Sequence, residues 1–506
     1  MAWHRVISLQ GRAVLDMQSC AVPSRHVCKR QKQRTQCAVW IGMLVIGLSL
    51  AAPVQAQTSG FTPLSGIGGI TAPERATGLA VETLCPKLDP NMTAGGVGDL
   101  QIRCTEMIGN SLSGNTSAAS APLLPLSYEE IAAQGKSAVE TSNRNIGARL
   151  ATLRGGAANL GFRRFALQND APAVPYTLVA SLSPFAASSV VAASTPSNFS
   201  RLGVFANGSF TGGGKDVSGQ EAGFDYTIFG LTLGADYRFT DNFVLGATFN
   251  YMSNDIDFDS TSINNTLSGG GIDTQSFGFS LYSTYYVSNQ FYVDGIFTFG
   301  WNNYDIDRRI IYAIPSTDRM GNLIPGTTTV NQTATADTDS TQYSISVGVG
   351  YDFYVQGFTI TPLARLEYSR LNIDGYQEGI NNTANGFGLA LAFDDQHVDS
   401  LVSVLGGQAS YAISTGIGVL LPQVRVEWRH EFENDARTIT SRFVNDPART
   451  PLVLGTEDPD RDFFTLGTGL SATFRGGVAA FVSYETVVGL VRVSAHSVVG
   501  GIRFEF

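Results

Sequence analysis

From about residue 202 to the end of the chain, apolar and polar side chains alternate with a period of two. The clearest example is the stretch 226–251, in which two alternating runs meet at the polar turn 240–242. Successive side chains of a strand point to opposite faces of a sheet, so each run predicts a strand with one apolar and one small or polar face. Such an apolar face covers a core in a soluble sandwich and contacts lipid in an outer-membrane barrel.

Twelve segments of this kind follow one another, and the connections between them alternate in length. The segments are 202–211, 224–239, 243–254, 273–287, 291–303, 341–355, 358–369, 399–413, 418–432, 463–474, 478–487 and 495–506. The short connections are 240–242, 288–290, 356–357, 414–417 and 475–477, and the long ones are 212–223, 255–272, 304–340, 370–398, 433–462 and 488–494. An even strand number with alternately short and long connections is the plan of outer-membrane barrels. The sequence therefore predicts an all-β transmembrane barrel of twelve antiparallel strands over residues 201–506.

The composition agrees with a barrel that faces lipid. Charged residues make up 15% of the chain, against roughly 25% in soluble domains. Beyond residue 60 no apolar run is long enough for a transmembrane helix, so any spanning must be by strands.

The first 56 residues have the pattern of a secretory signal peptide. Basic residues precede the apolar run 38–52, and Val54, Gln55 and Ala56 form an A-x-A-like cleavage site, which places cleavage between Ala56 and Gln57. The region before the apolar run is unusually long. It is compatible with an extended signal, with a start codon at Met17, or with an uncleaved anchor.

Removal of residues 1–56 changes the charge and the cysteine count of the chain. The segment holds seven of the 33 Lys and Arg but only one of the 43 acidic residues, so the mature chain is strongly acidic and nucleic acid is a poor partner. Two cysteines remain, Cys85 and Cys104. In an exported protein such a pair predicts a disulfide, worth about 3 kcal/mol for a loop of roughly 20 residues.

Between the signal and the barrel we expect a small region that is mainly α-helical or irregular. Residues 57–126 form a short disulfide-closed segment that reads mostly as loop, with a short helix near 99–108. Residues 127–155 predict one long helix, because Ser127 and Glu130 have capping-box spacing and Gly155 ends the run of helix formers. This helix belongs either to a small periplasmic domain or inside the barrel lumen. Residues 156–200 are an Ala/Ser/Pro-rich linker.

Charged side chains on the predicted strands fall on the face opposite the apolar one, which is the lumen face. They are Asp236, Arg238, Arg365, Glu367, Arg425, Glu427 and Arg429. Buried charges need partners, so we interpret them as a structural salt-bridge network, with a selectivity or gating role as the alternative. No metal site, cofactor site or catalytic constellation is apparent. The segment 57–200 holds no His, and the barrel's His397, His430 and His496 are scattered.

The last strand alternates up to a terminal aromatic residue, with Ile502, Phe504 and Phe506 on the outward face. This ending resembles the C-terminal signal by which bacterial outer-membrane proteins engage the barrel assembly machinery. Together with GVFANGSF at 203–210 and the hairpin sequence at 223–251, it makes residues 201–506 resemble the autotransporter β-domain family.

The resemblance implies a barrel in the outer membrane of a Gram-negative bacterium, with its long loops at the cell surface. It also implies export of an N-terminal passenger, with a helix before the first strand threading the pore. The expected partners are outer-membrane lipid, the assembly machinery and periplasmic chaperones, and we expect a monomer. The sequence departs from the family pattern in the passenger, which is short and shows no β-solenoid repeat.

The favoured function is therefore type V secretion in which the barrel translocates or displays its own short N-terminal region. One alternative is a structural or adhesive surface barrel that acts through acidic loops such as those at Asp255 and Glu457. Another is a porin-like channel plugged by the N-terminal helix. We do not expect an enzyme.

Overall fold

The computed structural model describes residues 62–127 except 93, and 201–505 except 220, 260–261, 264–265, 268, 434 and 475–477. All of these belong to one compact unit, Gln57–Phe506. The predicted signal peptide, its cleavage site at Ala56 and Gln57, the linker 156–200 and Phe506 lie outside the described residues. So does the predicted long helix 127–155, apart from Ser127.

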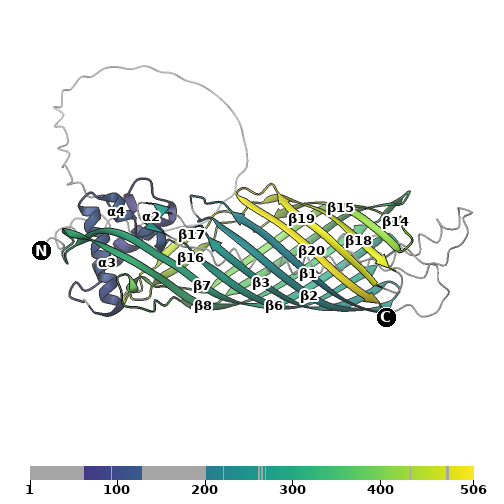
Figure 1. Ribbon diagram of the computed structural model, residues 1–506, viewed down its shortest axis with the longest axis horizontal. Helices are drawn as coiled ribbons and strands as arrows, with labels where there is room; N and C mark the ends of the chain where they lie inside the picture. Colours follow the sequence, from purple (N-terminus) through teal and green to yellow (C-terminus); the bar gives the residue numbers. More distant parts are fainter. Residues whose placement is uncertain are drawn as a thin grey trace, which may run out of the picture. The chain divides into compact units, whose positions relative to one another are not determined.

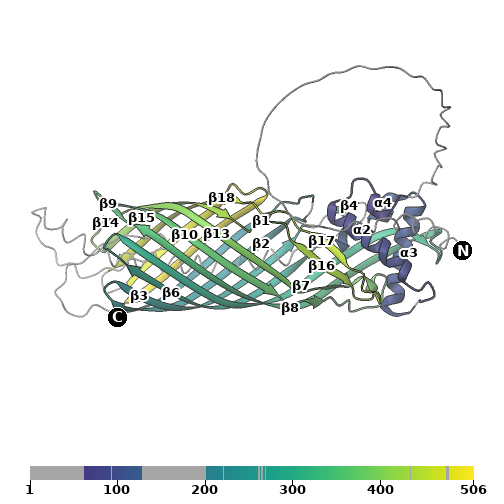
Figure 2. The same ribbon diagram turned by 180° about the vertical axis from the view of Figure 1, so that it is seen from behind.

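A closed barrel accounts for most of the described chain (Figures 1 and 2). Every strand pairs antiparallel with the next, and the last pairs with the first from Gly203↔Glu505 to Lys215↔Val493, which closes the sheet. Its strands are β1 (Leu202–Lys215), β2 (Phe224–Thr240), β3 (Phe243–Phe258), β6 (Gly270–Tyr286), β7 (Phe291–Thr317), β8 (Leu323–Tyr351), β10 (Phe358–Ile373), β13 (Gln396–Tyr411), β15 (Gly418–Glu431), β18 (Asp462–Phe474), β19 (Val478–Val488) and β20 (Val493–Glu505). The prediction of twelve antiparallel strands is confirmed.

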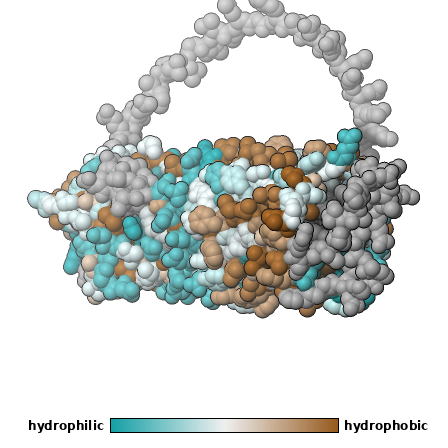
Figure 3. All heavy atoms as spheres, turned by 45° about the vertical axis from the view of Figure 1, so that its right-hand side comes forward, coloured by the Kyte–Doolittle hydropathy of each residue, from teal (hydrophilic) through white to brown (hydrophobic). Residues whose placement is uncertain are grey.

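The outer face of the barrel is apolar and the lumen face is polar. On β2, for example, Phe229 is 50% exposed on the outside, whereas the lumen-facing Thr232 is fully buried. The apolar side chains form the brown band in Figure 3. Aromatic rings are packed side by side within it, such as Tyr251, Phe277 and Trp301 on three neighbouring strands. Aromatic girdles of this kind lie at membrane interfaces.

Glycines on the lumen face make room for large rings from neighbouring strands. A Cβ added at Gly246 would lie 2.2 Å from Cζ of Tyr282, and one added at Gly350 would lie 2.1 Å from the Tyr292 hydroxyl. Tyr282 and Tyr292 are 1% and 2% exposed, so neither ring has free space to move into. The small residues at these positions are therefore a packing requirement of the barrel wall.

We expect Gly246→Ala to lower the free energy of unfolding by about 1–3 kcal/mol, because the added methyl overpacks the Tyr282 ring. The measurement is urea unfolding of the refolded barrel in lipid vesicles. Gly208→Ala is the matched control, because a Cβ there has nothing within 4 Å. Equal unfolding midpoints for the two variants would contradict the packing argument.

Strands β7 and β8 continue far beyond the other strands as one hairpin. They pair without interruption from Phe291↔Tyr351 to Pro315↔Thr327, so the predicted loop 304–340 is largely wrong. Four short strands from two other long connections make a separate small sheet: β11 (Tyr376–Gln377), β12 (Leu391–Phe393), β16 (Thr438–Phe443) and β17 (Leu452–Gly455). All of these lie at the barrel end opposite the short turns.

Residues 62–127 form helices. The short helix predicted near 99–108 lies within one of them, and the prediction that the rest of this region is mostly loop is wrong. The helices are η1 (Leu64–Gly66), α2 (Ala72–Leu84), η2 (Cys85–Lys87), α3 (Gly95–Leu112), α4 (Thr116–Ser120) and α5 (Leu123–Leu126). Thr71 and Glu74 form a capping box at the start of α2, with Pro73 in the first turn. Among the described residues, no helix is both long and apolar enough to cross a membrane.

Candidate functional site

The helices of residues 62–127 are packed against the barrel's long connections. Their buried side chains, including Val81, Leu100 and Met107, share one hydrophobic cluster with residues of the β7–β8 extension, the β10–β13 connection and the β15–β18 connection. The chain enters β1 beside the end of β20, at the short-turn end of the barrel. The docked helices therefore lie at the opposite end from that entry point.

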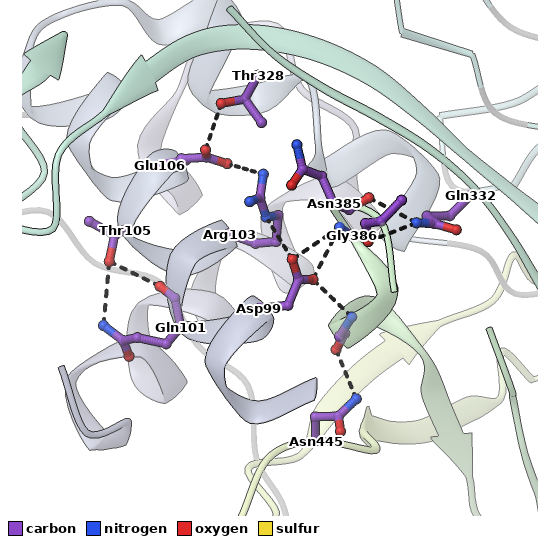
Figure 4. Close-up of polar contacts among 12 residues, drawn as sticks. Asp99, Gln101, Arg103, Thr105, Glu106, Thr328, Gln332, Asn385, Gly386 and Asn445 are labelled. Carbon is purple, nitrogen blue, oxygen red and sulfur yellow. Dashed lines mark hydrogen bonds and ion pairs between the residues drawn. The ribbon is translucent and has the colours of Figure 1, made fainter. Parts of the chain in front are cut away.

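A buried charged cluster on α3 holds this helix to the β10–β13 connection (Figure 4). The carboxylate of Asp99 accepts hydrogen bonds from the amides of Gly386 (3.1 Å) and Gly388 (2.9 Å). Arg103 lies one turn on, 3.4 Å from Asp99 and 2.6 Å from Glu106. All three charged side chains are less than a tenth exposed.

Glu106 continues the cluster to the β7–β8 hairpin. Its carboxylate accepts a hydrogen bond of 2.8 Å from the hydroxyl of Thr328 on β8. Burial raises the pKa of Glu106, and the neighbouring Arg103 guanidinium and the Thr328 hydroxyl oppose that rise. One turn further along the same face of α3, the Asn110 amide donates to the carbonyl of Pro315 on β7 at 3.0 Å. The helix is thus bonded to both the hairpin and the loop beside it.

A second buried ion pair ties the loops to the last short helix. Arg308 on β7 donates to both carboxylate oxygens of Glu378, at 2.8 and 2.5 Å. The same guanidinium donates to the carbonyls of Pro125 (2.7 Å) and Leu389 (3.3 Å). Arg308 is 2% exposed and Glu378 4%, so this is a fully desolvated, bidentate pair.

Weaker contacts extend the docking to further loops. The amide of Ala72 donates to the carbonyl of Gly219 in the β1–β2 connection, and Lys87 donates to Thr450 in the β15–β18 connection. The helices therefore touch the β1–β2, β7–β8, β10–β13 and β15–β18 connections.

The predicted disulfide between Cys85 and Cys104 is present and links η2 to α3. Both cysteines are buried in the shared hydrophobic cluster. The sequence predicted this bond, but it did not predict that the bond would be buried between the helices and the barrel's long connections.

Five of the seven predicted lumen charges, on β10 and β15, are brought together, and a residue of β19 joins them. Arg365 contacts Glu367 (2.5 Å) and Glu427 (3.5 Å), and Arg425 contacts Glu427 (3.3 Å). Arg429 contacts Glu367, and Arg425 also contacts Glu485, which the sequence analysis did not single out. The structure thus joins these residues in one ion-pair network across three strands.

Asp236 and Arg238 lie apart from that network, near the short-turn end. Asp236 accepts a hydrogen bond from the Tyr282 hydroxyl at 3.0 Å and lies 3.5 Å from Arg503 of β20. Arg238 donates to the carbonyl of Asp241 in the turn that follows it.

On the last strand, Ile502 and Phe504 point outward and are 48% and 39% exposed. The histidines remain scattered over the barrel: His430 pairs with Asp462, and His496 contacts the Tyr484 hydroxyl. In the described part of the chain, no group of three or more His, Cys, Asp or Glu side chains is placed to hold a metal ion.

An aspartate row crosses four strands on the outer face, four positions beyond the Tyr251–Trp301 aromatics. Asp255, Asp273, Asp305 and Asp337 are direct cross-strand partners on β3, β6, β7 and β8. Exposed charges do not lie in hydrocarbon, so the row marks where the barrel has left the membrane. The hydrogen bond with Asp337 raises the pKa of Asp305, and burial and the neighbouring Asp273 raise that of Asp255.

We expect Asp305→Asn to stabilise the protein at neutral pH by up to about 1 kcal/mol, because like charges directly opposite each other are destabilising. A raised pKa favours the folded state at low pH, and that contribution is lost as the pH rises through the folded-state value. The gain should therefore be present at pH 7.5 and absent at low pH, below the carboxyls' ordinary pKa. Urea unfolding at both pH values measures it. Asp241→Asn is the control, because Asp241 lies in the short turn between β2 and β3, outside the strand pairing; the same gain there would refute the pairing effect.

The closed barrel, its apolar outer band and its charged lumen define an integral outer-membrane β-barrel. The chain belongs to the autotransporter β-domain family: the family model "Autotransporter beta-domain" matches residues 204–485, more than half of the chain.

Solved structures of translocator domains are similar to this chain. The translocator domain of autotransporter NalP from Neisseria meningitidis is 18% identical, with a TM-score of 0.45, over 62% of this chain and 90% of that one. The β-domain of the Bordetella autotransporter BrkA is 19% identical, with a TM-score of 0.39, over 60% of this chain and 100% of that one.

Two curated proteins are also similar over shorter stretches. An uncharacterised protein of the trpE-trpG intergenic region of Pseudomonas putida is 32% identical over 118 residues, which are 22% of this chain and 18% of that protein. Lipase 1 of Photorhabdus luminescens is 24% identical over 172 residues, 34% of this chain and 25% of that protein. The matches span a quarter or less of these relatives.

Proposed function

We propose that the barrel exports its own N-terminal region and keeps it at the cell surface as a docked helical domain. The observation that carries the proposal is the position of residues 62–127. They are packed on the long connections, whereas β1 begins at the short-turn end. In outer-membrane barrels the long loops face the outside and the short turns face the periplasm. The N-terminal region must therefore cross the membrane to reach the place where it is docked.

The test is protease access to a tag in the exposed turn 89–92 between α2 and α3, on intact cells. A surface position predicts that the tag is labelled and cut without permeabilising the outer membrane. A second tag in the short turn 240–242 is the control, and it should be reached only after permeabilisation. Protection of both tags on intact cells would refute export.

We further propose that the protein acts without catalysing a reaction. The polar side chains of α3, including Asp99, Arg103 and Glu106, are committed to docking contacts. The name of the Photorhabdus relative describes a lipase, and a match over a quarter of that protein gives this chain no hydrolytic site. Insertion by the barrel assembly machinery is the general expectation for the family, and the help of periplasmic chaperones and a monomeric state belong to the proposal.

An adhesive surface barrel remains a second candidate, favoured by the long β7–β8 hairpin and its exposed tip. Met320 at that tip is 75% exposed. Loss of cell adhesion in a variant that lacks residues 318–322, with the N-terminal tag still at the surface, would favour this role.

A further inference from the structure

The helical region 62–127 does not enclose a hydrophobic core of its own. Thirteen residues of this region belong to the shared cluster, and the other twelve come from barrel connections. The barrel's share includes Ile310, Val330 and Leu389, each less than 1% exposed. A segment of this size is at the lower limit for independent folding, even with a disulfide. Without the barrel's share, the thirteen helix residues would lose about half of the cluster in which they are buried.

The barrel's connections need the helices in the same way. The β7–β8 extension is a two-stranded ribbon joined by the short strand β5 (Thr266–Leu267) at one position of β7, and such a ribbon has little stability unless one face is covered. Its inner residues Ile310, Tyr312 and Ile314 are buried in the cluster that the helices complete. The small sheet of β11, β12, β16 and β17 likewise contributes Leu391, Ile439 and Leu454 to that cluster.

Helix α3 and the β10–β13 connection fit closely enough for polar contacts between a side chain of one and the backbone of the other. Gly386 has a φ of +95°, and an added Cβ at Gly388 would lie 2.4 Å from the carbonyl oxygen of Gly96 on α3. This close approach allows Asp99 to accept from both glycine amides. Separation would leave the charges of Asp99 and Glu106 without their partners on the barrel side.

From these contacts we infer that the β7–β8 extension and the connections 374–395 and 432–461 are a docking platform that completes the fold of residues 62–127. The two parts form one cooperative unit, so the exported region is a permanent component of the barrel and not a releasable passenger. The inference rests on the proposed function only for the side of the membrane on which this unit lies.

Hydrogen exchange of the full-length protein in detergent tests the inference, because in a cooperative unit a substitution in either part should speed exchange in both parts. Leu389→Ala, on the barrel side, should speed exchange of the α2 and α3 amides by roughly 30-fold or more, the factor expected for a buried Leu→Ala change. It should speed β12 and β16 by the same factor. Leu100→Ala, on the helix side, should produce the same pattern, because coupled parts open together. Thr83→Ala, on the exposed side of α2, should leave β12 and β16 unchanged.

Independent parts would give a different result: Leu389→Ala would speed only the barrel connections, and Leu100→Ala only the helices. That outcome would overturn the inference. If a variant fails to assemble, the unsubstituted protein decides the question, because a cooperative unit requires α3 and β16 amides to share one opening free energy and one dependence on denaturant. Since these measurements use purified protein, they can fail while the tag experiment succeeds, and the reverse.

Discussion

Replacement of Arg308 by Met should release the N-terminal helices from the barrel. Arg308 holds both oxygens of Glu378 and the carbonyls of Pro125 and Leu389. Its loss leaves a buried carboxylate without its cation, which costs about 3–5 kcal/mol. Hydrogen exchange of the α3 amides in the purified protein should become faster by roughly 100-fold or more, because exchange of these buried amides follows the population of the open form.

Two variants sharpen this experiment. Arg308→Met combined with Glu378→Met removes both charges together, and it should restore much of the protection. Arg442→Met is the matched control: Arg442 pairs with Asp394, but the two side chains are 32% and 53% exposed, so less than about 1 kcal/mol is expected. If Arg308→Met leaves the exchange rates of the α3 amides unchanged, the ion pair does not hold the docked state.

Replacement of Glu427 by Gln should destabilise the barrel itself by about 3 kcal/mol or more. Glu427 is fully buried and faces both Arg365 and Arg425. Without the charge of Glu427, the three arginines keep Glu367 and Glu485 as acidic partners in this network, and the positive charges of the network outnumber the negative ones. Urea unfolding in lipid vesicles measures the loss.

The control for the lumen network is Glu505→Gln at the rim, where the side chain is 23% exposed and a smaller effect is expected. Adding Arg365→Gln to Glu427→Gln should recover part of the lost stability. If Glu427→Gln changes ion conductance but not stability, the network serves gating and the structural interpretation is wrong.

The sequence predicted those elements whose residue pattern can be recognised within a single segment. Alternation located all twelve strands because each has an apolar lipid face. The extension of β8 was missed because its exposed positions, such as Thr333 and Asp337, are polar, and its buried positions mix polar residues such as Gln332 with a few apolar ones, so no clear alternation results. The repeated threonines there are a β-strand signal that alternation alone overlooks. Helix α2 was also missed. Thr71 and Glu74 have capping-box spacing at its start, but the many Gly and Pro residues around them favoured the prediction of a loop.

The docking site was beyond reach of the sequence for a different reason. Asp99 binds glycine amides 287 and 289 positions away, and neither partner stands out in its own neighbourhood. A loop whose backbone receives a carboxylate has no residue pattern of its own. The lumen charges were found individually, since a charged residue on a strand's polar face is visible locally, but their pairing across three strands required the fold.

The division of the hydrophobic cluster between the helices and the barrel's connections also limits how the protein can be re-engineered for display. A foreign cargo that replaces residues 62–127 would expose Ile310, Val330 and Leu389 to water. Because exposed apolar patches promote aggregation, such a fusion should aggregate at the cell surface. Insertion into the exposed turn 89–92 keeps every one of those side chains covered. Cargo is therefore better carried as a guest within the helical domain than as its substitute.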